Sequence, residues 1–193
     1  MPLITLNELF KAINRHITLS PSLKQALEER LSSVVFKKRE VVLHPHQVCT
    51  KSYFIQEGIL RLYYYKEEKE ITEFFSGVGE WVNSPRSFMS RQPDIYYLDA
   101  VQETKAWTLH VEDLLYLFEH FPEMERYSRM DMGSIFIHLM DRLHSLRFST
   151  AKDKYLHFLA SYPDIHHHIP LGMAASYIGI TQETLSRLRR PKK

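Results

Sequence analysis

The sequence predicts an α+β fold: an antiparallel β-roll, a long helix after it, and a helix-turn-helix at the C-terminal end. Three patterns support this prediction. Short β-branched and aromatic runs fill residues 36 to 110, apolar residues return at helical spacing after residue 111, and an alanine and a glycine four residues apart stand near the end. A chain of 193 residues that is 44% hydrophobic can bury a substantial core.

The composition indicates a cytoplasmic protein. The single cysteine, Cys49, can form no internal disulfide, which fits a reducing compartment. The N-terminal residues lack the basic segment and apolar run of a signal peptide. No apolar run approaches the roughly 18 residues of a membrane span, so we expect no membrane partner.

The first part of the chain is expected to change from helices to strands. Residues 3 to 35 should form short amphipathic helices, because leucines recur at helical spacing and Ser20-Pro21 can cap a helix. From Phe36 onward, turn-prone residues separate short strand-like runs, which are Val41–Leu43, Tyr53–Ile55, Ile59–Tyr65, Ile71–Phe75, Leu98–Val101 and Ala106–Leu109. No helical crossover fits between them, so the strands should pair antiparallel.

A long helix is expected from Pro122 to about Phe148, after a short one from about Glu112 to Glu119. Its apolar residues step by four and three, as in a two-heptad seam, at Met132, Phe136, Leu139, Leu143 and Leu146. A second stripe consists of Met130, Ile137 and Met140. One stripe can pack on the strands, whereas the other needs a partner, for which a second copy of the chain is the economical choice. The alternative is that the C-terminal segment covers it.

The most specific pattern is the helix-turn-helix expected between Leu171 and Arg190. Such a motif needs a small residue where two helices cross, which Ala175 supplies, and a glycine able to adopt positive φ in the turn, which Gly179 supplies. Thr181 is a good N-cap for the second helix. The apolar residues expected to lock the second helix onto the first are Leu185 and Leu188.

Removing the buried positions leaves a polar face on the second helix. Gln182, Glu183 and Arg187 have the side chains that read base edges in a major groove. The residues expected to contact the DNA backbone are Thr181, Ser186, Arg189, Arg190 and Lys192. The alternative is an ordinary helical hairpin with a basic exit.

Charge is distributed unevenly along the chain. The segment from Pro170 to Lys193 has a net charge of +4. Because the whole chain has a net charge of +2, the remainder has −2. Nucleic acid is the commonest anionic partner for such a basic end, although a solvated tail has the same charge.

The arrangement resembles the Crp/Fnr (cAMP-receptor-protein-like) regulators of bacteria over nearly the whole chain. The most specific similarities are Tyr53–Tyr63, which resembles the central β-roll hairpin of that family, and Gly179–Arg187, which resembles its recognition helix. The resemblance implies a cyclic-nucleotide-binding-like sensor domain in residues 1–121, a dimerisation helix in 122–148 and a DNA-binding domain in 149–193. It implies a homodimeric transcription regulator that binds double-stranded DNA and works with RNA polymerase, not an enzyme.

The sequence also departs from that family. Gln182 stands where many members carry a base-reading arginine, so the preferred DNA sequence should differ. Members that bind cyclic nucleotides have a Gly-Glu pair followed by an Arg-Ser or Arg-Thr pair; Gly79-Glu80 matches the first, but Asp94-Ile95 falls on the second. An aspartate there would repel a phosphodiester, although Arg86 and Arg91 lie in the same loop. We therefore expect no cAMP binding; the effector, if one exists, is not indicated.

Two alternative functions follow from the residues. A cupin-type metal enzyme also uses a β-roll, and His44-Pro45-His46 supplies its histidine pair, but Glu57 and His110 are badly spaced to complete a metal site. A ligand-sensing protein-interaction module with a vestigial helix-turn-helix is the other. No catalytic residues, metal ligands or cofactor are expected. The chain ends at Lys193, where many relatives continue into a β-hairpin wing, so either the wing is absent from this subgroup or the end is truncated.

Overall fold

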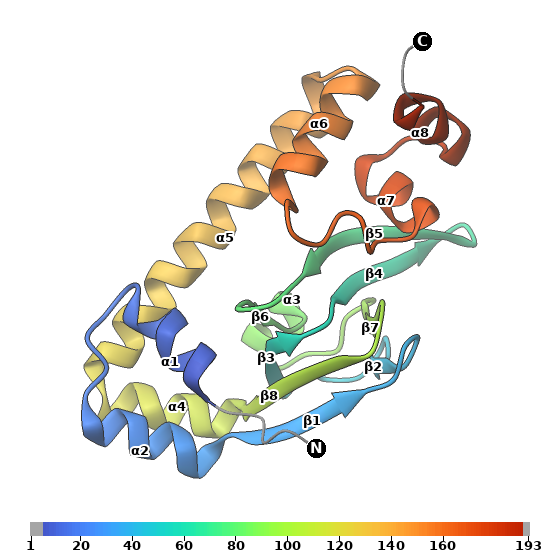
Figure 1. Ribbon diagram of the computed structural model, residues 1–193. Helices are drawn as coiled ribbons and strands as arrows, with labels where there is room; N and C mark the ends of the chain where they lie inside the picture. The colour runs from blue at the N-terminus through green and yellow to red at the C-terminus, as the bar shows by residue number, and fades with distance from the viewer. Residues whose placement is uncertain (1–5, 191–193) are drawn as a thin grey trace.

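The computed structural model describes residues 6–190, and its helices and strands follow the predicted order (Figure 1). The chain begins with two helices, α1 (Asn7–Asn14) and α2 (Pro21–Arg30). The hydroxyl of Ser20 accepts the backbone N–H of Leu23 at 3.2 Å, which caps α2 at the predicted place.

The prediction of helix up to residue 35 is wrong at its end. Ser32–Phe36 form strand β1, which pairs antiparallel with β8. The β-branched and aromatic residues Val34, Val35 and Phe36 favour an extended strand once a neighbouring strand is present to pair with them.

Within residues 6–190, eight strands form the β-roll as two antiparallel four-stranded sheets. The first has the order β1-β8-β3-β6, with β8 at Thr104–His110, β3 at Lys51–Glu57 and β6 at Trp81–Val82. The second has the order β2-β7-β4-β5, with β2 at Val41–Leu43, β7 at Tyr97–Ala100, β4 at Leu60–Lys66 and β5 at Lys69–Ser76. Strand β5 is therefore an edge strand, and one side of its backbone has no strand partner.

Two short elements were not predicted from the sequence. Strand β6 has two residues, and helix α3 (Pro85–Ser90) has six. Neither is long enough to show a helical or strand period in the sequence.

Apolar side chains fill the inside of the roll and the space under the N-terminal helices. The core of the roll contains Phe36, Leu43, Tyr53, Ile55, Leu60, Leu62, Val82, Phe88, Leu98 and Ala106. Helix α4 (Val111–His120) joins α1 and α2 over a second core, which includes Leu9, Ile13, Leu23, Leu27, Phe54, Leu117, Met124 and Tyr127.

The remaining helices extend from this base. Helix α5 (Pro122–Phe148) leaves the roll as a long diagonal rod, and α6 (Ala151–Ser161) folds back beside its far end (Figure 1). A capping box between Thr150 and Asp153 starts α6. Helices α7 (Leu171–Ile178) and α8 (Gln182–Arg189) follow, with α7 lying next to β5 (Figure 1).

Candidate nucleic-acid interface

The turn between α7 and α8 forms at the glycine predicted for it. Gly179 adopts the left-handed conformation with φ +72°, which a glycine takes at no steric cost. The N–H groups of Gly179 and Ile180 both donate to the carbonyl of Ala175, at 3.0 and 3.1 Å, and so satisfy the end of α7. The hydroxyl of Thr181 accepts the backbone N–H of Thr184 at 3.2 Å and caps α8.

Buried residues hold α8 against α7 as predicted. Leu185 is fully buried, and Ala175 and Ile178 are buried opposite it in α7. Leu188 is half-buried. Because the apolar side of α8 is fixed in this way, its polar side must face solvent.

The exposed side of α8 carries the residues predicted to read DNA. Gln182, Glu183 and Arg187 are exposed, and they line a shallow groove of about 460 Å³ between α8 and Leu171 at the start of α7. Of the residues predicted to contact the DNA backbone, Ser186 is half-buried, and the exposed ones are Thr181, Arg189 and Arg190. Lys192 lies outside the described residues.

Glu183 is held as an anion at the start of α8. Its carboxylate accepts its own backbone N–H and the Thr181 hydroxyl, and these contacts, with the nearby Arg187, lower its pKa below the ordinary value. An ionised carboxylate can accept a hydrogen bond from cytosine N4.

Gln182 has a neighbour that the sequence analysis missed. A Cβ built on Gly172 would lie 2.5 Å from Nε2 of Gln182, so the glutamine side chain occupies the space that a side chain at position 172 would need. The two residues are ten apart in sequence and meet only because α7 and α8 cross. No periodicity or spacing signal could have found this pair.

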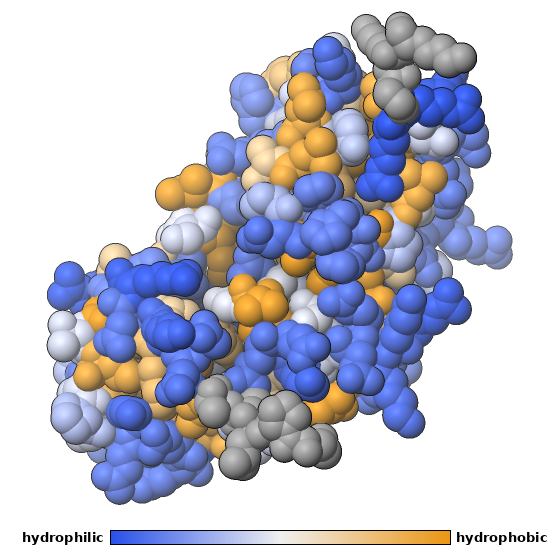
Figure 2. Space-filling view, in the orientation of Figure 1, coloured by the Kyte–Doolittle hydropathy of each residue, from blue (hydrophilic) through white to orange (hydrophobic). Residues whose placement is uncertain are grey.

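The predicted seam of α5 is largely exposed to solvent. Met132, Leu139 and Leu143 are exposed, Phe136 has 64% of its surface exposed, and Leu146 is half-buried near the α7–α8 turn. Figure 2 shows hydrophobic residues at the surface along α5.

The expectation that one stripe of α5 packs on the strands is wrong for the middle of the helix. The residues of the second stripe, Met130, Ile137 and Met140, are also exposed. The physical reason is that the half-buried side of α5, beyond Met124 and Tyr127 at its start, carries polar residues, including His138 and Arg142, and Arg142 hydrogen-bonds β5.

The residues predicted to form a degenerate effector pocket take separate structural roles. Gly79 adopts φ +87°, and the carboxylate of Glu80 accepts the N–H of Gly77 at 2.8 Å. Asp94 is buried; it accepts the Ser84 hydroxyl and, at 3.0 Å, the N–H of Tyr96. Ile95 is half exposed. The carboxylate of Asp94 thus ties the loop after α3 to the residue before α3.

The two arginines that a shifted alignment would offer belong to α3 and its end: Arg86 lies in the helix, and Arg91 is its C-cap. Arg86 is exposed, and Arg91 lies over the ring of Phe88 with its guanidinium carbon 5.0 Å from the ring centroid. Among the described residues, no cluster of three or more His, Cys, Asp or Glu is placed to hold a metal ion. Across residues 6–190, no helix has the length and apolar character to cross a membrane.

Comparisons with known proteins agree with this architecture. Residues 33–121 match the family model of the cyclic nucleotide-binding domain. The structure is similar to that of FixK2 from Bradyrhizobium japonicum, with a TM-score of 0.71, 16% identity and coverage of 82% of each chain. It is also similar to the c-di-GMP responsive global regulator CLP from Xanthomonas campestris, with a TM-score of 0.69, 13% identity and coverage of 88% of this chain and 89% of that one.

A third similar structure is that of a regulator assigned to the Crp/Fnr family from Eubacterium rectale. Its TM-score is 0.67 at 18% identity, and the match covers 88% of this chain and 82% of that one. No curated protein sequence matches the chain significantly. The resemblance to Crp/Fnr regulators is therefore confirmed at the level of the fold.

Proposed function

We propose that this chain, which has the fold of Crp/Fnr regulators and a cyclic nucleotide-binding domain in residues 33–121, is a DNA-binding transcription regulator. One observation carries the proposal. Helix α8 is locked onto α7 by buried Leu185 and presents exposed Gln182, Glu183 and Arg187 on its other side. These side chains have the donors and acceptors that distinguish base pairs in the major groove.

The remaining polar groups of α8 have a different role in this proposal. Arg189 and Arg190 are exposed at the end of the helix, where they would neutralise phosphates without reading sequence. The hydroxyl of Ser186 can donate to a phosphate oxygen, the hydroxyl of Thr181 can do so if it releases Glu183, and Lys192 adds a charge. The regulator would act in the cytoplasm, together with RNA polymerase, and would catalyse no reaction.

The direct test is loss of DNA binding after substitution on α8. Duplexes selected from a random library by the wild-type protein would be titrated with Arg187→Ala and Glu183→Ala, and binding followed by fluorescence anisotropy. Each variant should bind at least about fivefold more weakly, because a good base contact discriminates by about 1–3 kcal/mol and about 1.4 kcal/mol is tenfold. Arg15→Ala, an exposed arginine after α1, is the matched control and should bind normally. Unchanged affinity in both α8 variants, or a salt-independent affinity in the wild type, contradicts the proposal.

We further propose that two copies associate through α5. The middle of this helix exposes a continuous apolar surface that a single copy leaves in water, and symmetric dimers are the commonest way to cover such a surface. Phe136→Glu should convert the dimer into a monomer, because it places a charge in the centre of that surface. Sedimentation velocity measures the change; a wild type that sediments as a monomer at every concentration contradicts it.

The sensor domain is proposed not to bind cAMP. Asp94, at the position of the phosphate-binding arginine, is buried and already hydrogen-bonded, and its carboxylate would repel a phosphodiester. Calorimetric titration with cAMP should show no heat of binding; saturable binding at micromolar concentration contradicts this part of the proposal.

A further inference from the structure

The free edge of strand β5 is covered by residues from the C-terminal helices. The hydroxyl of Ser176, in α7, donates to the carbonyl of Glu70 at 2.6 Å and accepts the N–H of Thr72 at 2.9 Å. One serine side chain thus binds two backbone groups of the edge strand that no neighbouring strand can pair. It is a contact between residues more than 100 positions apart in the sequence.

Arg142, from α5, binds the same strand beside Ser176. Its Nη1 donates to the carboxylate of Glu73 at 2.9 Å, and its Nη2 donates to the carbonyl of Thr72 at 3.0 Å. Its guanidinium also lies over the ring of Tyr177 in α7, 4.6 Å from the centroid. Arg142 therefore joins α5, β5 and α7 at one point.

Apolar packing continues this contact along the strand. The hydroxyl of Tyr162, after α6, accepts the N–H of Phe75 at 3.3 Å. Phe75 belongs to a core that the β-roll shares with the C-terminal helices, which includes Phe158, Tyr162, Tyr177 and Leu185. Since Leu185 is the residue that fixes α8, the direction of α8 depends on how this core sits on β5.

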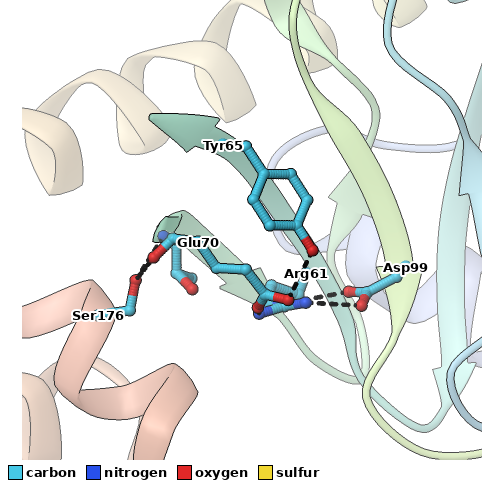
Figure 3. A network of polar contacts seen from close by, with 6 residues as sticks. Arg61, Tyr65, Glu70, Asp99 and Ser176 are labelled. Atoms are coloured by element: carbon cyan, nitrogen blue, oxygen red, sulfur yellow. Dashed lines mark hydrogen bonds and ion pairs between the residues drawn. The ribbon is translucent and has the colours of Figure 1, made fainter. Parts of the chain in front are cut away.

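Glu70 connects the contact to the buried centre of the second sheet (Figure 3). Its carbonyl binds Ser176, whereas its carboxylate accepts Nη1 of Arg61 at 2.8 Å and the hydroxyl of Tyr65 at 3.0 Å. Arg61 in turn donates to both carboxylate oxygens of Asp99, at 3.0 and 2.7 Å. Glu70, which receives α7, is thus itself held by an ion-pair network that joins β4, β5 and β7.

We infer that Ser176 and Arg142 are positioning residues: they seat α7 on β5 and so fix the direction in which α8 is presented. This inference rests on the proposed function. In a dimer that reads two half-sites, the two α8 helices must lie at a set distance, about one turn of the duplex or a multiple of it. The contacts of Ser176 and Arg142 with β5 set the position of α8 within each copy, and the association through α5 sets the distance between the α8 helices of the two copies.

The test measures how DNA affinity depends on the spacing between two half-sites. Ser176→Ala removes both hydrogen bonds and leaves the residues of α8 unchanged. Duplexes that carry two half-sites, at spacings varied one base pair at a time, would be compared with a duplex that carries one. Ser176→Ala should bind the best spacing roughly tenfold more weakly and discriminate less among spacings, with single-site affinity unchanged. A merely structural role would lower affinity for every duplex alike.

A second substitution and a control keep the result interpretable. Arg142→Lys keeps the charge but lacks the planar guanidinium whose two Nη atoms bind Glu73 and Thr72, and it should flatten the spacing dependence in the same way. Ser33→Ala, at an exposed serine of β1, should leave the spacing profile unchanged. If both variants keep the wild-type profile, the positioning role is overturned while DNA binding stands. If the wild type binds no duplex, the proposed function fails first.

Discussion

Replacing Arg61 by methionine is the severest single test of what holds the β-roll together. Arg61 has only 2% of its surface exposed, and its guanidinium makes three charge-assisted hydrogen bonds, two to Asp99 and one to Glu70. Methionine fills similar space without the charge, so the buried carboxylate of Asp99 loses its partner where water cannot easily replace it. Breaking a buried ion pair in this way costs about 3–5 kcal/mol.

Urea denaturation at neutral pH, followed by the fluorescence of Trp81 and Trp107, measures this cost as a fall in the free energy of unfolding. Protein concentration must be held constant, because association of two copies would add to the apparent stability. The matched control is Lys105→Met, which removes an exposed ion pair with Glu57 and should change the unfolding free energy little. A loss below about 1 kcal/mol for Arg61→Met, as for a surface pair, would refute the reasoning.

The same substitution should change the response to acid. Burial raises the pKa of Glu70, but the hydrogen bond and charge of Arg61 outweigh it, so the pKa lies below its ordinary value. A carboxylate with a lowered pKa in the folded state stabilises the protein above the ordinary pKa, and that contribution is lost as the pH falls through the folded value. As the pH falls from neutral through the lowered pKa of Glu70, the unfolding free energy of Arg61→Met should therefore decrease less than that of the wild type.

Three further predictions concern other sites. Burial, with His157 and Arg142 nearby, lowers the pKa of His138, so the protein should lose stability as the pH drops below the ordinary histidine pKa of 6.5. Thermal melts at about pH 7 and pH 5 should show a smaller decrease in melting temperature for His138→Phe than for the wild type. Gly172→Ala should displace the Gln182 side chain and change the preferred base at one position of each half-site, and identical selected sequences would contradict this. The buried thiol of Cys49, its pKa raised mainly by burial, should react with a thiol reagent far more slowly in the folded than in the urea-unfolded protein.

The features predicted correctly from sequence depend on neighbouring residues. The long helix begins at Pro122, because proline suits the first turn of a helix, and it continues to Phe148, because apolar residues recur at helical spacing up to its last turn. The α7–α8 turn at Gly179 and the cap at Thr181 follow from the conformations open to glycine and from a threonine hydroxyl close to free N–H groups. Each of these signals is contained within a few turns of chain.

The features missed depend on residues far apart in the sequence. Ser176 looks like any half-exposed helical serine until α7 meets β5, and Arg61 looks like a surface residue of a strand that turns out to be covered on both sides. Hydrophobic patterning assigns polar residues to the solvent side, so a buried arginine with two carboxylate partners escapes it. The contact between Gly172 and Gln182 escapes because it forms only where α7 and α8 cross.

The contact of α7 with β5 and the association of two copies through α5 can be tested separately, because their loss should change DNA binding in different ways. Phe136 lies in the exposed middle of α5, so Phe136→Glu should abolish the gain from a second half-site at every spacing. Ser176→Ala should keep the dimer, but lower the gain at the best spacing and spread what remains over several spacings. A Phe136→Glu variant that retained a sharp optimum would mean that the copies associate through another surface, and the exposed stripes of α5 would then need a different partner.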